Sequence, residues 1–392
     1  MGNWKKCIIA DLGTVVGGAT PSTKKPDNYD GGTIAWITPK DLAGFSGRFI
    51  SHGERNITEA GLHSCSTQIM PRHTILFSSR APIGYVAIAE NEVCTNQGFK
   101  SVVPNDNTDY MFLYYLLLNN RQNIEHMGSG TTFKEVSGKT MRGIEVCVPE
   151  SKEEQIRISS MLSAIDDKIE ENERINKNLL EQAQTIFDQE FLSLDSIPAN
   201  WTKSSLLGIA DYLNGLAMQK YRPAEGEQGL PVLKIKELRQ GSCDANSELC
   251  SPSIKPEYIV HDGDVIFSWS GSLLVDFWCG GTCGLNQHLF KVTSKTYDKW
   301  FYYAWTNHHL QKFAAIAADM ATTMGHIKRE ELSKAEVLIP SRPDYERIGS
   351  LLAPLYDLVI SNRIENRKLA SLRDELLPQL MTGQIDVSEV SL

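Results

Sequence analysis

The stretch 153–191, near the middle of the 392-residue chain, contains neither proline nor glycine. Apolar residues recur in it at steps of four and three, which places them on one narrow stripe of a helix of about ten turns. Two polar residues on the stripe would fix the register of a helix pair at some cost in stability, because a buried asparagine needs a hydrogen-bonding partner. The stripe is Ile158, Leu162, Ile165, Ile169, Asn172, Asn176, Leu179, Ala183 and Ile186.

The partner helix is in the same chain. Adding 190 to the first seven of these positions gives Ile348, Leu352, Leu355, Val359, Asn362, Asn366 and Leu369. The same offset relates Asn96-Gln97 to Asn286-Gln287. The chain is therefore a tandem repeat, and we predict an α+β fold in which two globular mixed α/β units are each followed by a long helix. The two helices pair as an antiparallel coiled coil, in which Asn172 faces Asn366 and Asn176 faces Asn362.

The repeat divides the chain into globular domains at 1–151 and 192–341, long helices at 152–191 and 342–381, and a tail at 382–392 that we expect to be frayed. Below, 1–151 is called the first domain and 192–341 the second domain. Pro354 predicts a bend or a restart in the second helix, and Pro378 predicts its end.

Composition restricts the function. The net charge is −9, but ten acidic and five basic residues between Lys152 and Glu190 account for −5 of it, so both domains are near neutral. A near-neutral domain binds DNA weakly, so a nucleic-acid-binding role would need a partner that supplies part of the affinity. No run of about 18 apolar residues and no signal peptide is present, which favours a cytoplasmic protein without membrane contact.

No catalytic or metal-binding pattern emerges. GxGxxG, HExxH, GxSxG and the acidic-Pro-Pro-aromatic tetrad of amino-methyltransferases are absent from the sequence, and Phe133 stands where a phosphate loop ending in Gly138-Lys139 needs glycine. The eight cysteines contain no CxxC pair and are expected to be reduced. Cys279, Cys283 and His288 are the one cluster resembling metal ligands, but their spacing is unusual for zinc and favours a structural role.

The two copies keep their strands and helices but differ in their loops, as in GATPSTKKPDN against LAMQKYRPAEG. This pattern indicates one scaffold with two recognition surfaces. We assign Asn96-Gln97 and Asn286-Gln287, which both copies keep, to the frame, meaning the scaffold that the two copies share. Loop residues with hydrogen-bonding side chains can read base edges or hold phosphates. In the first domain the candidates are Lys24, Lys25, Thr38, Lys40, Arg80, Thr131, Thr132 and Lys134, and in the second they are Gln219, Lys220, Tyr221, Lys234, Lys236, Ser268, Trp269, Ser270, Thr322, Thr323 and His326.

Four features identify a family: the repeat, the Asn-Gln pairs, the equivalent loops with Thr131-Thr132 and Thr322-Thr323, and the helices that start after Pro149 and Pro340. In these features essentially the whole chain resembles the specificity subunits of type I restriction-modification systems. The resemblance implies a non-catalytic subunit whose two target recognition domains read a bipartite, asymmetric sequence of double-stranded DNA, one half-site each. It also implies two methyltransferase subunits docked on the helices. These partners would bind S-adenosylmethionine, which this chain would not, and methylate adenine, and a translocase-nuclease subunit can join. Pro354 departs from a symmetric pattern and puts equal docking of the two partners in doubt.

The apolar stripe from Ile158 to Ile186 is about 42 Å long, which is comparable to the ~34 Å of one DNA turn. The length of the helices would therefore set the spacer between the two half-sites. Three alternatives remain open. The same architecture could serve a methylation-only complex, the chain could be a coiled-coil scaffold whose ends bind protein, or it could be an enzyme with an unrecognised site.

Overall fold

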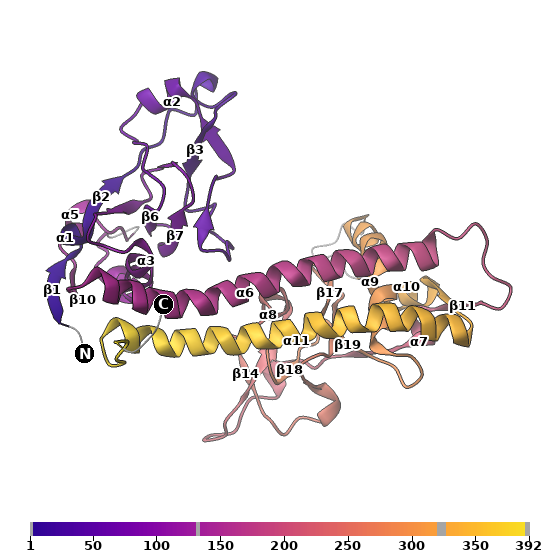
Figure 1. Ribbon diagram of the computed structural model, residues 1–392. Helices are drawn as coiled ribbons and strands as arrows, with labels where there is room; N and C mark the ends of the chain where they lie inside the picture. Colours follow the sequence, from indigo (N-terminus) through magenta and orange to yellow (C-terminus); the bar gives the residue numbers. More distant parts are fainter. Residues whose placement is uncertain (1–2, 131–133, 320–326, 389–392) are drawn as a thin grey trace. The chain divides into compact units, whose positions relative to one another are not determined.

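The computed structural model describes residues 3–130, 134–319 and 327–388 (Figure 1). The chain divides into two compact units, of which the first comprises 1–170 and 370–392 and the second 171–369. The first unit is built from β1 Trp4–Ile8, α1 Ile9–Leu12, β2 Gly13–Gly17, η1 Pro26–Asn28, β3 Ile34–Ile37, β4 Phe49–Ile50, β5 Arg55–Ile57, α2 Glu59–His63, β6 Ile75–Ser79, β7 Ile83–Ala89, β8 Cys94–Thr95, β9 Lys100–Pro104, α3 Tyr110–Asn119, α4 Arg121–His126, α5 Gly138–Arg142, β10 Glu145–Pro149 and the first half of α6 Lys152–Phe187.

The strands of the first unit form a five-stranded sheet in the order β2-β9-β6-β7-β4, a three-stranded sheet β5-β3-β8 and the pair β1-β10. All five residues of β6 are buried, which fits the central place of this strand in its sheet. Helix α3, the most apolar stretch of the domain, packs on β6 and β7 and carries Phe112 and Tyr115 into the core. The stretch 109–126 contains no proline or glycine and would suit one helix, but the chain breaks at Asn120 into α3 and α4.

The second unit repeats this order with the second half of α6, a π-helical turn η2 Asp188–Leu192, β11 Thr202–Ser205, α7 Leu206–Ile209, β12 Asp211–Asn214, η3 Met218–Lys220, β13 Leu230–Leu233, α8 Ile235–Gln240, β14 Leu249–Cys250, η4 Pro256–Tyr258, β15 Ile259–Val260, β16 Val265–Ser268, β17 Leu274–Phe277, β18 Cys283–Leu285, β19 Leu289–Thr293, α9 Lys299–Asp319, α10 Arg329–Lys334, β20 Glu336–Ile339 and most of α11 Arg342–Met381.

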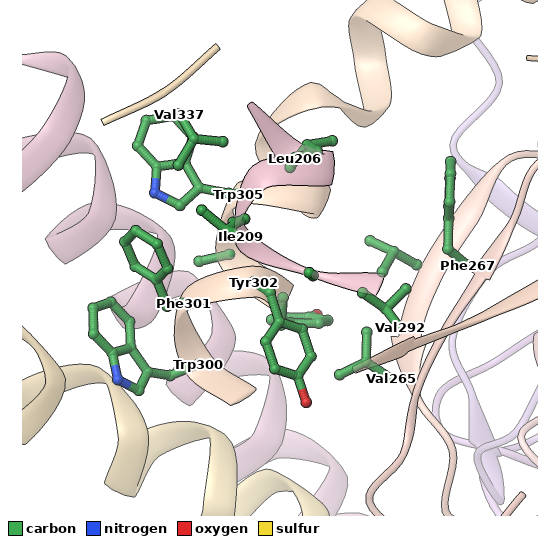
Figure 2. Packing of buried hydrophobic residues seen from close by; sticks show 14 of the residues in the cluster. Leu206, Ile209, Val265, Phe267, Val292, Trp300, Phe301, Tyr302, Trp305 and Val337 are labelled. Carbon is green, nitrogen blue, oxygen red and sulfur yellow. The ribbon is translucent and has the colours of Figure 1, made fainter. Parts of the chain in front are cut away.

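Its sheets run β12-β19-β16-β17 and β14-β13-β18-β15, with the pair β11-β20. The core is rich in aromatic rings from α9. Figure 2 shows Trp300, Phe301, Tyr302 and Trp305 among aliphatic side chains such as Val265. In both units one parallel pairing joins corresponding strands, β3 with β8 and β13 with β18. This shared pairing fixes which loop residues of the two domains correspond.

Helices α6 and α11 run antiparallel in each unit. In the first unit Ile158 and Leu162 of α6 pack in one buried cluster with Leu377 and Leu380 of α11. In the second, Ala183 and Phe187 share a cluster with residues of α11 that include Ile348 and Leu352. The stripe therefore packs both against the partner helix and into the domain cores.

The asparagines of the stripe meet across the pair. The amide nitrogen of Asn172 donates to Asn366 Oδ1 at 2.8 Å and to Glu365 Oε2 at 2.7 Å, and that of Asn362 donates to Asn176 Oδ1 at 2.9 Å. These are the two pairs that the offset of the repeat predicts. Asn172 is 1% exposed and Asn176 6%, so the bonds are sheltered from water.

The second helix differs from the prediction at both prolines. Helix α11 is continuous from Arg342 to Met381, without a restart at Pro354 and without an end at Pro378 (Figure 1). Pro354 lies on the exposed face, as its neighbour Leu351 does, so the carbonyl group that loses its N–H partner can bond water instead.

The prediction of a frayed tail is also wrong for the described part of it. Val387 is 1% exposed and packs with Leu380, Met381 and the core of the first unit, and Ile385 packs against the same cluster. Gly383, at φ 70°, turns the chain close against the ring of Trp4. Two apolar residues thus tie this segment to the core of the first unit.

Replacing Val387 with alanine is expected to lower the free energy of unfolding by about 1–2 kcal/mol, because two buried methyl groups are lost. Urea unfolding of the full chain measures the change. Ser388→Ala, at the neighbouring exposed position, should change it by less than about 0.5 kcal/mol. Equal midpoints for the two variants would show that the tail does not contribute to stability.

Arginine–carboxylate pairs connect each domain to the long helix that follows it. Arg48, 5% exposed, donates from Nε and Nη2 to the two oxygens of Glu170 on α6 at 2.8 and 2.9 Å, and it also pairs with Asp167. In the second unit Arg367 of α11 forms a fork of two 2.7 Å bonds to Asp262. Such bidentate pairs fix the orientation of the two side chains and also stabilise the contact between domain and helix.

These pairs predict acid sensitivity. The hydrogen bonds from Arg48 lower the pKa of the Glu170 carboxyl, and those from Arg367 lower the pKa of Asp262. Because the folded-state pKa lies below that of the unfolded chain, near 4 for both side chains, the contribution is complete above that pH and is lost as the pH falls through the lowered folded-state values. Denaturant titrations between about pH 3 and 7 should show this loss, and Glu170→Gln should reduce it. An unchanged pH dependence in that variant would contradict the assignment.

Candidate nucleic-acid interface

In the first domain the structure brings three of the predicted residues to one hollow. Thr38, Lys40 and Arg80 line it together with Pro39, Ala81, Asn96 and Gly98, and its volume is about 520 Å³. Thr38 and Lys40 come from the turn after β3, Arg80 from the end of β6, and the last two from the turn after β8. These turns lie at the ends of strands of two sheets, so the hollow rests on rigid elements.

Asp41 holds this wall in shape. Its Oδ2 accepts from both the backbone N–H and the hydroxyl of Thr38 at 2.7 Å, and its Oδ1 accepts from the N–H of Glu54 at 2.7 Å. Glu54 in turn pairs with Lys40 at 2.6 Å, and this hydrogen bond raises the pKa of the lysine. Asp41 was not among the predicted residues, although the spacing Thr-x-x-Asp is a recognisable turn signal.

The second domain builds the corresponding wall with different residues. By the shared strand pairing, Lys234 and Lys236 take the places of Thr38 and Lys40. The N–H of Lys234 donates to Glu237 at 3.2 Å, as Thr38 donates to Asp41. Lys234 pairs with Glu248 at 2.6 Å, and Lys236 pairs with Asp244 at 3.1 Å. DNA phosphates would have to replace these carboxylates, which lowers the affinity that each lysine can contribute.

The end of β16 and the loop after it hold three candidates in different environments. Ser268 is fully buried, and its hydroxyl donates to Ser272 O at 2.9 Å, as the equivalent Ser78 donates to Pro82 O at 2.8 Å. Ser268 therefore belongs to the frame of the loop rather than to its surface, and the shared Ser in the repeat was the available signal. Trp269 is partly buried and donates from Nε1 to Asn214 at 3.0 Å, while Ser270, 5% exposed, bonds His288 Nδ1 at 3.1 Å.

The remaining candidates lie on the surface or outside the described residues. Lys24 and Lys25 are exposed in the loop before η1, Lys134 is exposed beside Glu135, and Gln219, Lys220 and Tyr221 are exposed in and after η3. The structure gathers none of these six into the hollow of the first domain or the His288 loop. Thr131, Thr132, Thr322, Thr323 and His326 lie outside the described residues.

Sequence reasoning considered His288 only as a metal ligand. Within the described ranges no group of three His, Cys, Asp or Glu side chains could hold a metal ion. The imidazole of His288 bonds Ser270 and lies 6.2 Å from the ring of Trp269, measured between centroids. None of the described helices is long and apolar enough to cross a membrane.

Comparison with known proteins assigns the family. The family model for the type I restriction modification DNA specificity domain matches the chain twice, at residues 1–181 and 198–372. The chain belongs to the specificity subunits of type I restriction-modification systems. This specificity subunit is 32% identical to the type I restriction enzyme MjaIX specificity subunit of Methanocaldococcus jannaschii, over 99% of its own length and 95% of the relative's.

Two further similarities concern the family and the fold. The EcoR124I/EcoR124II specificity subunit of Escherichia coli is 28% identical over 42% of this specificity subunit and 40% of its own length. The crystal structure of the S subunit from M. genitalium superposes with a TM-score of 0.58 at 16% identity, covering 97% of this chain and 96% of that one. The second similarity confirms the predicted fold, with two domains that alternate with two long helices.

Proposed function

We propose that this specificity subunit reads a bipartite, asymmetric DNA target with one half-site per domain, while methyltransferase subunits docked on α6 and α11 carry the catalytic site and bind S-adenosylmethionine. The observation that supports this most is the placement of unlike residues on equivalent frames. Arg80 and Lys40 surround a hollow in the first domain, whereas Trp269, Ser270 and His288 gather at the equivalent position in the second. Two frames with different polar loops suit two different base sequences.

The need for partners follows from charge. The candidate lysines Lys40, Lys234 and Lys236 are already paired with carboxylates of their own domain. The whole chain carries a net charge of −9, so DNA affinity from phosphate neutralisation alone would be low. Methyltransferase subunits that also contact the duplex would supply the missing affinity and leave base reading to this subunit. A translocase-nuclease subunit can join such a complex without changing this division.

The test is methylation sequencing of DNA from cells that carry this gene together with its methyltransferase gene. The control carries the methyltransferase gene alone. We expect a bipartite, adenine-methylated motif only where both proteins are present. No new motif, despite a stable complex of the two proteins, would contradict the proposal and favour a protein scaffold.

Replacing both Lys24 and Lys25 with alanine is expected to weaken binding to target and non-target DNA alike. Each phosphate contact contributes about 0.9 to the slope of log affinity against log salt concentration, so losing two lowers the slope by about 2. Arg80→Ala should instead relax the preference at one base of the first half-site. Titrations of the complex at several salt concentrations separate the two effects, and a lysine variant that changes base preference would contradict the assignment.

A further inference from the structure

The Asn-Gln turn has the same backbone role in both domains, and the asparagine performs it. Asn96 Oδ1 accepts the N–H of Gly98 at 2.8 Å, and Asn286 Oδ1 accepts the N–H of His288 at 3.3 Å. Each asparagine thus closes a local turn with its own side chain. The glutamine that follows takes no part in this bond, so its presence in both copies needs another explanation.

Gln97 and Gln287 lie beside the two candidate reading surfaces. Asn96 and Gly98, on either side of Gln97, line the hollow that Arg80 borders, and Gln97 itself is exposed. Gln287 is half-buried beside His288, which bonds Ser270. Both glutamines therefore stand where a base edge would be read if these surfaces bind DNA.

The neighbours of the two glutamines engage opposite ends of the carboxamide. In the first domain the hydroxyl of Thr20 donates to Gln97 Oε1 and occupies one of its two acceptor sites, so the amide NH₂ is the end that the loop leaves fully available. In the second domain Gln287 Nε2 lies 3.4 Å from His288 Nε2. An amide nitrogen can only donate, so the imidazole Nε2 accepts and its Nδ1–H donates to Ser270. This arrangement occupies one of the two N–H groups of Gln287, so the carbonyl oxygen is the end that the loop leaves fully available.

Each domain lacks the partner that the other uses. Ala19 and Leu216 make equivalent backbone bonds, to Thr95 O and Leu285 O, so Thr20 corresponds to Ala217, which has no hydroxyl. His288 corresponds to Gly98, where a Cβ atom would lie 2.8 Å from Pro39 Cγ and 2.9 Å from Asn96 Oδ1. An imidazole at position 98 would not fit without displacing these atoms. The loops thus orient one shared residue in two ways.

We infer that Gln97 and Gln287 are base-reading residues of opposite polarity: Gln97 donates to a keto base in the first half-site, and Gln287 accepts from an amino base in the second. Guanine O6 and thymine O4 are the keto acceptors of the major groove, and adenine N6 and cytosine N4 are its amino donors. The inference rests on the proposed function, since it needs the two domains to read DNA. It also replaces the assignment of both glutamines to the frame.

Glutamine-to-glutamate substitutions test the polarity, because glutamate keeps the acceptor and removes the donor. The variants Gln97→Glu and Gln287→Glu are prepared in the full complex with the methyltransferase subunits and compared on DNA libraries randomised at one target position at a time. Gln287→Glu is expected to keep its preference for an amino base, because the imidazole of His288 can carry its proton on Nε2 and hold one carboxylate oxygen while the other faces the base. Gln97→Glu should lose at least about tenfold of its discrimination for a keto base and gain preference for an amino base. Both variants add the same charge, so their general loss of affinity cancels in the ratio between bases.

Three controls complete the design. Gln122→Glu, on the exposed face of α4, adds the same charge away from the turn and should leave all preferences unchanged. Asn96→Ala loosens the turn that carries Gln97, so it should reduce the discrimination at the same position without a gain of preference for an amino base. Thr20→Val removes the hydroxyl that orients Gln97 and should broaden the same position of the first half-site.

Unchanged base preferences in both glutamate variants would overturn the inference, and so would equal changes in both. The wild-type complex separates these outcomes from a failure of the proposed function. If the wild type shows no sequence preference, the proposed function itself fails. If it shows a bipartite motif that neither glutamine variant alters, the inference alone fails.

Discussion

Replacing Arg48 with alanine is expected to lower the free energy of unfolding of the first unit by about 2 kcal/mol. The guanidinium is 5% exposed and makes charge-assisted hydrogen bonds to Glu170 and Asp167. Removing it eliminates these bonds and the packing of the side-chain stem, and it leaves Glu170 without a counter-charge. We expect less than the full cost of a buried unpaired carboxylate, because the Glu170 side chain is 35% exposed and can be hydrated.

Arg174→Ala is the matched control. Arg174 also forms a fork with a glutamate, Glu171, at 2.7 and 2.8 Å, but its side chain is 72% exposed. Exposed pairs of this kind contribute about 0.5 kcal/mol or less, so the control should hardly change the free energy of unfolding. Urea unfolding at neutral pH measures both variants. Equal, small losses would show that burial does not strengthen the Arg48 pair.

Replacing Asn176 with leucine is expected to destabilise the helix pair by about 1–3 kcal/mol, because the amide of Asn362 loses its acceptor in a buried seam. Adding Asn362→Leu should restore the stability or exceed that of the wild type, since two apolar side chains pack well there. The pair of asparagines would then contribute register rather than stability.

A double-mutant cycle of the two positions measures the coupling, with Asn178→Leu on the exposed face of α6 as control. If the two leucine substitutions simply add, the hydrogen bond between the asparagines contributes nothing specific. In the complex, the double variant should keep a single spacer, because the Asn172–Asn366 pair still fixes the register of the helices.

The repeat could be recognised in the sequence because an apolar stripe with two asparagines recurs at a constant offset. That offset predicted which asparagines lie opposite each other. It also relates Ser78 to Ser268, but Ser268 was predicted from sequence as a base-reading candidate, and only the structure shows its role in the frame. Family resemblance then supplied the function. These signals are local or periodic, and therefore survive without three-dimensional information.

The features that the sequence did not predict depend on contacts between distant segments. Val387 is one of four apolar residues in the tail 382–392, and only the fold shows that it enters a core. Pro354 is tolerated because of the face on which it lies. The site at Gln287 depends on His288, Ser270 and the absence of a hydroxyl at Ala217, which no spacing rule brings together. Loop identity alone could not assign these roles.

The return of the C-terminal segment to the first unit has a consequence for synthesis on the ribosome. The core of that unit includes Leu377, Leu380 and Val387, whereas roughly 200 residues of the second unit are translated in between. At about 5–20 residues per second, the first unit waits on the order of 10–40 s with part of its apolar face uncovered. A chain cut short by a premature stop therefore never completes the unit with which it began.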